Sequence, residues 1–450
     1  MSKLNNLEND AADLVGKALK AGADACDVVV AKSDSLSISV RDGKTENSNR
    51  SENDLISIRV FSGKKVASVT ANSKTDPSKL AERAVAMAKV SPEDPYQGLV
   101  DRDQLFDTSK LAAINSDLDL FDPTHADPDR LEKDALECEA AGLGVEGVTK
   151  SMGAGASWSS SGFVLATSSN FVGSFERSGF SLSASMVAGE GTGMERDYDF
   201  DSAIHQSDLK CAAEIGQSAG EKVVKRVGPR QVKSGSYPVV CDRRISTGIL
   251  GTLMGAINGS SIARKTSFLR DEMGKQITSS GINIIDDPLM KRRMGSKLFD
   301  GEGIETEKLS FVEDGVLQQW VLDSATAREL NLATNGRAAR GETGIRPSTT
   351  NCYMEAGSVS FKDMISGIKE GLYLTETIGH GINLVTGDYS KGAAGFWIVD
   401  GEIAFPVAEI TVAGNLKDMF LNMTPANDLE FRYGTNAPTL LIDGMTIGGN

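Results

Sequence analysis

Residues 379–419 read GHGINLVTGDYSKGAAGFWIVDGEIAFPVAEITVAGNLKDM, a glycine-rich polar loop followed by two runs of apolar residues. The runs flank Asp400-Gly401, a dipeptide that favours the tight turn of a β-hairpin. The loop contains His380, one of only three histidines in the chain. This stretch therefore predicts an antiparallel hairpin and, next to it, a loop whose histidine is the first candidate for a functional residue.

The sequence around the hairpin is dominated by strand-like runs. Further Asp-Gly turn signals occur at 300–301, 314–315 and 443–444. Helical patterns are few, and they cover about 243–258, 323–330 and 415–422. We therefore predict that residues 231–450 form a large β-rich domain, barrel-like and mostly antiparallel.

The start of the chain mixes helix and strand patterns. Apolar residues recur at helical spacing over 7–19, and strand-like runs fill residues 26–71. Asp76-Pro77 then predicts the beginning of a helix over about 77–90, because proline is tolerated in the first helical turn. These segments predict an N-terminal α+β domain over residues 1–95.

Residues 96–230 are predicted to form a middle α+β domain that begins with a connector rich in Pro, Asp and Ser. Its strands, over 148–189, carry many small side chains, which suits a sheet whose outer face another surface approaches. The segment GEGTGMERDYDFDS, residues 189–202, is predicted as a loop before a helix over about 206–226. The whole chain is therefore predicted to be α+β, with N-terminal α/β units followed by the β-rich domain.

The composition excludes several classes of protein. Lys and Arg total 47 against 62 Asp and Glu, a net charge of −15 that repels nucleic-acid phosphates and anionic membrane surfaces. The five cysteines form no C-x-x-C pair, so neither a disulfide framework nor a zinc ribbon is indicated. The N-terminus lacks the apolar region of a signal peptide, and no run of 18 apolar residues occurs. We expect a cytoplasmic protein that binds neither nucleic acid nor membrane.

A catalytic constellation is hard to find in the sequence. His125, His205 and His380 are too far apart to share a helix turn, and none is followed by the glutamate of a zinc-peptidase motif. GDYSKG misses the spacing of a serine nucleophile motif, and GEGTG does not continue into a dinucleotide-binding motif. The residues by themselves indicate an organised fold with few catalytic groups.

The long stretch 379–419 nevertheless resembles the signature region of the TldD/PmbA family, in particular its TldE (PmbA) branch. Further matches are TNCYMEAG at 350–357, RKTSF at 264–268 and the ending PTLLIDGMTIGG at 438–449. With RDGKTENSNRSENDLISIRVFSGKKVASVTAN near the start, the resemblance spans nearly the whole chain. It implies a heterodimeric metallopeptidase, also called a modulator of DNA gyrase, whose two related subunits enclose a chamber where peptides are cut.

The TldD-type subunit of this family carries zinc on H-E-x-x-x-H and a later cysteine. Counted back from RKTSF, that motif falls on STGILGTLMGAING, at Gly251, Thr252 and Ala256 to within about one residue. Glycine and alanine cannot bind zinc, and threonine cannot replace glutamate as a general base at neutral pH. We therefore expect no catalytic residue and no metal in this chain, and zinc in a TldD-like partner.

The loop residues then belong to the chamber or to a subunit interface: His380, Asn383, Gly387, Asp388, Gly392 and Gly395. For the glycines, a role in hairpin geometry alone is the other reading. The favoured function is that of a TldE-type subunit that completes the chamber and presents unfolded peptides to the partner's zinc, with exposed sheet edges holding the peptide. Alone, such a chain could form a homodimer.

Two alternatives stay open. One is a self-sufficient hydrolase that uses Asp388 or His380. The other is a non-enzymatic homodimer that modulates gyrase or toxin–antitoxin systems through protein contacts.

Overall fold

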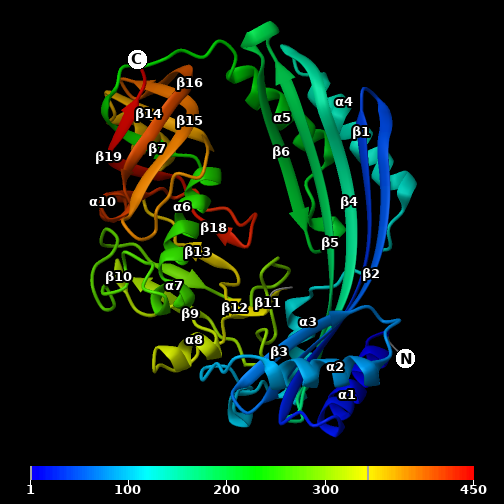
Figure 1. The fold of residues 1–450 in the computed structure, drawn as a ribbon. Helices are drawn as coiled ribbons and strands as arrows, with labels where there is room; N and C mark the ends of the chain where they lie inside the picture. Colours follow the sequence, from blue (N-terminus) through cyan, green and yellow to red (C-terminus); the bar gives the residue numbers. More distant parts are fainter. Residues whose placement is uncertain (1–2, 342–343) are drawn as a thin grey trace.

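The computed structural model of the protein describes residues 3–341 and 344–450, and its architecture is α+β. Figure 1 shows a sheet of very long strands standing beside a C-terminal half built from shorter strands and helices. The N-terminal helices lie at one end of the long sheet, and the C-terminus lies at the far end of the other half. The predicted fold class is confirmed.

The long sheet has six strands, all paired antiparallel in the order β3-β2-β1-β4-β5-β6. The strands are β1 Ala25–Arg41, β2 Lys44–Ser62, β3 Lys65–Ala71, β4 Val148–Thr167, β5 Val172–Ala188 and β6 Glu195–Ala203. Strands from the first and the middle predicted units thus share one sheet, since β1 pairs with β4 along fourteen residues of each strand.

Four helices cover one face of this sheet, namely α1 Lys3–Lys20, α2 Pro77–Val90, α4 Pro128–Leu143 and α5 Ala212–Lys225. The carboxylates of Asp76 and Asp127 cap α2 and α4, and the helix start predicted at Asp76-Pro77 is confirmed. Alternate β1 residues, such as Val28 and Ile38, point toward the helices and are buried in two apolar clusters. Period-two alternation along the strands therefore separates a helix-covered face from an opposite face.

One end of the opposite face joins the C-terminal half through an aromatic cluster. Phe299 of that half packs against Phe171 with ring centroids 5.3 Å apart and against Phe175 at 5.8 Å. Leu118, which ends α3 Leu111–Leu118, is buried in the same cluster. The region predicted as a connector thus contributes a helix, because its apolar residues are buried between the two halves.

The C-terminal half contains a closed five-stranded barrel. Its strands are β7 Gly235–Cys241, β14 Glu370–Ile378, β15 Asp388–Val399, β16 Glu402–Asn415 and β19 Leu440–Gly448. The barrel closes because β16 pairs with β19 as well as with β15, and β17 Met423–Pro425 extends it at β19. All its pairings are antiparallel except β14 with β7, so the predicted barrel-like, mostly antiparallel domain is confirmed.

The Asp-Gly prediction holds at the hairpin that joins β15 and β16. Asp400 and Gly401 have φ values of 48° and 82°, as a two-residue hairpin turn with left-handed backbone requires. Asp314-Gly315 turns in the same way, whereas Asp443-Gly444 lies inside β19 at an irregular register. The dipeptide therefore marks a local backbone conformation, and the surrounding pairing decides whether a hairpin forms.

A second sheet and several short elements complete this half. The sheet has the order β10-β9-β8-β13-β18, with β8 Ile284–Asp286, β9 Leu309–Glu313, β10 Val316–Leu317, β13 Cys352–Met354 and β18 Thr435–Asn436. β11 Ala338–Gly341 pairs with β12 Gly344–Pro347. The helices are α6 Arg243–Ala256, α7 Gly259–Ala263, α8 Ser324–Glu329, α9 Phe361–Ser366 and α10 Leu416–Leu421.

Two local predictions are wrong. The segment 189–202, predicted as a loop, contains most of β6, because pairing with β5 stabilises an extended chain of alternating acidic and aromatic residues. The helix predicted from about residue 206 begins at Ala212, after a short 3-10 turn. No helix within residues 3–341 and 344–450 is long and apolar enough to cross a membrane.

Candidate functional site

Helix α6 carries Gly251, Thr252 and Ala256, the three positions that the sequence resemblance predicts to replace the zinc motif of TldD-type chains. Its N-cap is Asp242, whose carboxylate accepts the backbone N–H of Arg244 at 2.9 Å. Ile249 and Leu253 are buried in the core of the C-terminal half. Figure 1 places α6 on the side of this half that faces the long sheet.

The three positions predicted to replace the zinc motif have different environments. Gly251 is exposed, and a Cβ placed on it would meet nothing within 4 Å. Thr252 is half-buried, and its hydroxyl donates to the Gly248 carbonyl oxygen at 2.9 Å. Ala256 is fully buried. The surface of α6 around Gly251 therefore offers the hydroxyls of Thr247 and Thr252, and neither an imidazole nor a carboxylate.

The loop before β15 is held together by its own polar groups. Asn383 stabilises the loop through two hydrogen bonds. Its side-chain oxygen accepts the N–H of Val385 at 2.9 Å, and its backbone carbonyl accepts the N–H of Gly387 at 2.8 Å. The Asp388 carboxylate accepts the Thr386 hydroxyl at 2.6 Å. His380 is exposed at the edge of this loop. Asn383 and Asp388 thus shape the loop, and His380 is presented to solvent.

The loop also contacts α6 and the segment that follows it. Leu384 would lie 3.6 Å from a Cβ placed on Gly255, and its carbonyl accepts the N–H of Phe268 at 2.8 Å. Two stretches that carry the resemblance, RKTSF and the 379–419 block, therefore meet each other next to α6. His380, Asn383 and Gly387 belong to this loop and Asp388 begins β15, whereas Gly392 and Gly395 lie farther along that strand.

Two of the three glycines have specific geometric roles. Gly387 has a φ of +83°, which favours glycine. A Cβ on Gly395 would lie 2.0 Å from the carbonyl oxygen of Tyr373, so no other residue fits there. A Cβ on Gly392 would meet only ordinary contacts, the closest at 3.5 Å from the Ile378 carbonyl oxygen. Hairpin and barrel geometry thus account for Gly387 and Gly395 but not for Gly392.

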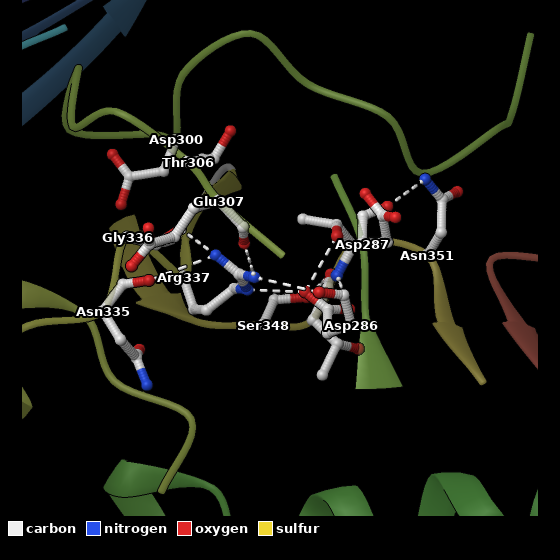
Figure 2. A network of polar contacts seen from close by, with 12 residues as sticks. Asp286, Asp287, Asp300, Thr306, Glu307, Asn335, Gly336, Arg337, Ser348 and Asn351 are labelled. Carbon is white, nitrogen blue, oxygen red and sulfur yellow. Dashed lines mark hydrogen bonds and ion pairs between the residues drawn. The ribbon is translucent and has the colours of Figure 1, made fainter. Parts of the chain in front are cut away.

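The TNCYMEAG stretch is held by a fully buried polar network (Figure 2). Asp286 accepts from Arg337 at 2.5 Å and from the backbone and hydroxyl of Thr350 at 2.7 and 2.8 Å. Arg337 donates also to the carbonyls of Asn335, Gly336 and Glu307. Both ionic side chains are inaccessible to solvent, so this network has a structural role.

Four of the five cysteines are buried, and His205 is bonded within the chain. Burial raises the pKa of the Cys26, Cys138 and Cys241 thiols to about 12, and that of Cys352 well above its ordinary value. His205 contacts the Asp119 carbonyl at 2.9 Å. Among residues 3–341 and 344–450, no three His, Cys, Asp or Glu side chains lie close enough together to hold a metal ion.

The face of the long sheet opposite the helices is lined with small polar residues. Ser37 of β1 lies opposite Asn49 and Ser157, and Ser157 lies opposite Ser181. We call this surface the serine face; it comprises Ser35, Ser37, Ser39, Asn47, Asn49, Ser51, Gly155, Ser157, Ser159, Gly179, Ser181, Ser183 and Ser185. A hollow of about 230 Å³ lies on it. The sequence indicated a small-residue sheet surface, and the register shows that these residues align across four strands.

The edge strand β6 continues the serine face with aromatic residues, and backbone groups along its edge are hydrogen-bonded within the chain. Tyr198 and Phe200 lie opposite Ser185 and Ser183. Their backbone N–H groups donate to the carboxylates of Asp197 and Asp199 at 2.8 and 2.9 Å. Arg432 donates to the Phe200 carbonyl. These backbone groups are therefore engaged within the chain, and β6 does not present them to an added peptide strand.

Arginines converge where β6 meets the barrel. Arg244 donates to Asp197 at 3.0 Å, and its guanidinium lies 5.5 Å from the centre of the Tyr198 ring. Arg226, at the end of α5, ion-pairs with Glu376 of β14 and with Asp197 at 3.5 Å. Burial is the largest single influence and lowers the pKa of Arg244, but the charge and hydrogen bond of Asp197 together with the charge of Asp242 outweigh it, so that the pKa is raised. The sequence does not reveal this cluster, because its members come from four separate segments.

Comparison with known proteins agrees with the sequence resemblance along the chain. Three family models match, for domain 1 of the PmbA/TldA metallopeptidases at residues 26–88, for their central domain at 121–227 and for their C-terminal domain at 234–449. The metalloprotease PmbA of Escherichia coli O157:H7 is 35% identical over 431 residues, which cover 95% of this chain and 93% of that protein.

Solved structures show the same fold. A candidate modulator of DNA gyrase from Bacteroides thetaiotaomicron superposes with a TM-score of 0.88 and 25% identity, with 100% of both chains covered. TldE from Thermococcus kodakarensis superposes with a TM-score of 0.84 and 21% identity, over 97% of this chain and 99% of that one. With three family models across its length and a full-length PmbA relative, the chain belongs to the PmbA/TldD metallopeptidase family, in its PmbA (TldE) branch.

Proposed function

We propose that this chain is the non-catalytic subunit of a TldD/TldE-type peptidase, and that it presents unfolded peptides to zinc held by a TldD-like partner. The observation that carries the proposal is the side-chain chemistry of α6. Around Gly251 and Thr252 the helix offers no group that fits Zn²⁺, which prefers imidazole, thiolate and carboxylate ligands. The metal and the general base would therefore come from the other subunit.

The serine face supports the presenting role. Hydroxyl and amide groups can bond the backbone of many peptides, and the small side chains leave room for whatever side chains the peptide carries. The face carries no charged residue among its thirteen members. This surface, and not the edge of β6, is the place where we expect an extended peptide to lie.

The first test is reconstitution with a TldD-like chain. Cleavage of an unstructured peptide is expected only when both chains are mixed, and elemental analysis is expected to find zinc in the partner and none in this chain after dialysis. The proposal fails if the isolated chain cuts peptides and retains stoichiometric zinc. Binding to gyrase without any TldD-like chain, and no cleavage in the mixture, would favour the non-enzymatic alternative.

A variant of the serine face makes the test specific. Ser157→Trp places an indole in the middle of the face, where β-sheet geometry tolerates aromatic residues. In the mixture, we expect peptide cleavage to fall at least tenfold while the zinc content stays unchanged. Ser78→Trp, at an exposed position of α2, is the matched control and should leave cleavage at the wild-type rate.

A further inference from the structure

The junction between the edge strand β6, helix α6 and the barrel strand β14 encloses a cavity of about 290 Å³. Its lining includes three arginines, Arg196, Arg226 and Arg244, against two carboxylates, Asp197 and Glu376. Two more carboxylates lie beside them, since Glu195 is 3.5 Å from Arg226 and Asp242 is 3.5 Å from Arg244. The volume is at the lower end of the ~300–1,000 Å³ range of small-ligand pockets, enough for one end of a peptide.

Two of the arginines are held in place by carboxylates. Arg226 pairs with Glu376 and with Asp197, and Arg244 pairs with Asp197 at 3.0 Å. Their charges are thus balanced within the protein, and they form a rigid wall. Arg196 differs, because among the described residues no carboxylate lies within ion-pair distance of its guanidinium.

A second polar group in the cavity has no partner. Thr375 of β14 is only 8% exposed, and its hydroxyl oxygen finds no hydrogen-bond partner among the described residues. A buried hydroxyl without a partner is costly, and such groups in folded proteins are usually explained by a ligand or water. An uncommitted guanidinium and an uncommitted hydroxyl therefore line the same cavity.

The cavity is continuous with the serine face. Ser185 belongs to both, and Tyr198, which lies opposite Ser185, lines the cavity as well. A peptide extended along the serine face would reach the cavity at the β6 side of the sheet. Guanidinium and hydroxyl donors together suit a carboxylate, to which arginine donates charge-assisted hydrogen bonds.

We propose that the cavity formed by β6, α6 and β14 is a carboxylate-binding subsite for the peptide on the serine face, with Arg196 and Thr375 as the donors. It takes either the C-terminal carboxylate or the side chain of an Asp or Glu. The inference rests on the proposed function and adds a substrate preference to it, for peptides that carry a carboxylate over neutral ones.

The test measures peptide binding to the isolated full-length chain by fluorescence anisotropy. Three unstructured peptides share one neutral sequence and an N-terminal rhodamine: one has a free C-terminus, one is amidated, and one is amidated with a single internal Glu. We expect at least one carboxylate peptide to bind about tenfold more tightly than the neutral amide, as a charge-assisted hydrogen bond implies. The peptide whose affinity is higher than that of the neutral amide shows whether the cavity binds the C-terminal carboxylate or the Glu side chain.

Two variants assign the donors. Arg196→Gln is expected to reduce the carboxylate preference to about twofold or less, and Thr375→Val to reduce it about threefold without lowering the melting temperature. Arg83→Gln, an equal charge change at an exposed position of α2, is the control and should keep the full preference.

The outcomes separate the two ideas. Equal affinity of wild type for all three peptides, or equal behaviour of Arg196→Gln and Arg83→Gln, overturns the subsite, while cleavage by the mixed subunits would leave the proposed function intact. If no peptide binds and the mixture does not cleave, the proposed function fails and the subsite fails with it.

Discussion

Arg244 at the start of α6 and Asp197 on the edge strand β6 form an ion pair, with Nη1 and Oδ1 3.0 Å apart. Asp197 is 5% exposed, and it also lies 3.5 Å from Arg226. The pair joins the barrel half to the long sheet at the wall of the arginine-lined cavity. It therefore couples the orientation of the serine face to that of α6.

Asp197→Asn should loosen this junction. The substitution removes the negative charge that two largely buried guanidinium groups share, and we expect it to lower the free energy of unfolding by about 2–3 kcal/mol. Urea denaturation followed by tryptophan fluorescence measures the change. Asp208→Asn removes a carboxylate that pairs with Arg292 near the surface, and it should cost less than about 1 kcal/mol. Equal effects of the two variants would contradict the coupling role.

Glu302 predicts a pH dependence of stability. Burial, together with the charge of Asp300, raises the pKa of Glu302 from 4.5 to about 7, although Arg59 partly opposes the rise. Because the folded protein holds this proton more tightly than the unfolded chain, its stability should fall as pH rises from about 4.5 to 7. A single such group contributes a slope of at most about 1.4 kcal/mol per pH unit.

Glu302→Gln removes this titration but keeps a side-chain oxygen that can accept the N–H of Ser324. In the wild-type protein this hydrogen bond to Glu302 is 2.9 Å long. The variant's stability should therefore decline less steeply than that of wild type across this window. Urea midpoints measured at intervals of half a pH unit give the two slopes. Superimposable slopes would show that Glu302 does not titrate in this range.

Gly395 and Gly392, three residues apart on β15, predict opposite outcomes for the same change. Gly395→Ala places a Cβ 2.0 Å from the Tyr373 carbonyl oxygen, and the resulting displacement of β14 should cost about 2–3 kcal/mol. Gly392→Ala has room for its methyl group and should be neutral or stabilise by up to about 1 kcal/mol through the unfolded chain. The melting temperatures of the two variants, compared with that of the wild-type protein, test both expectations.

Two of the positions predicted to replace the zinc motif, Gly251 and Ala256, should differ in how well they tolerate a histidine. Ala256→His forces an imidazole into a fully buried position and should destabilise the protein by about 3 kcal/mol. Gly251→His, at an exposed position with open space around its Cβ, should change the stability by less than about 0.5 kcal/mol. If Ala256→His is tolerated, and if a chain that carries both Gly251→His and Ala256→His binds zinc, the burial of Ala256 does not prevent zinc binding.

Much of the fold could be predicted from the sequence because the signals are local. The apolar spacing of the first helix, the helix start at Asp76-Pro77 and the Asp400-Gly401 hairpin depend on a few neighbouring residues, and the structure confirms each of them. The resemblance carried by residues 379–419 identified the family for a similar reason, since a long contiguous block of sequence can be recognised without a structure.

The sequence by itself thus determined the first helix, the helix start at Asp76-Pro77, the Asp400-Gly401 turn, the α+β class and the small-residue character of the middle strands. Only the tertiary structure decided that one sheet spans both N-terminal units, that Ala256 is buried and that Arg196, Arg226 and Arg244 line one cavity. The physical reason is the range of the interactions. Backbone preferences act between neighbours, whereas strand pairing, burial and the meeting of charges depend on segments that come together only when the chain folds.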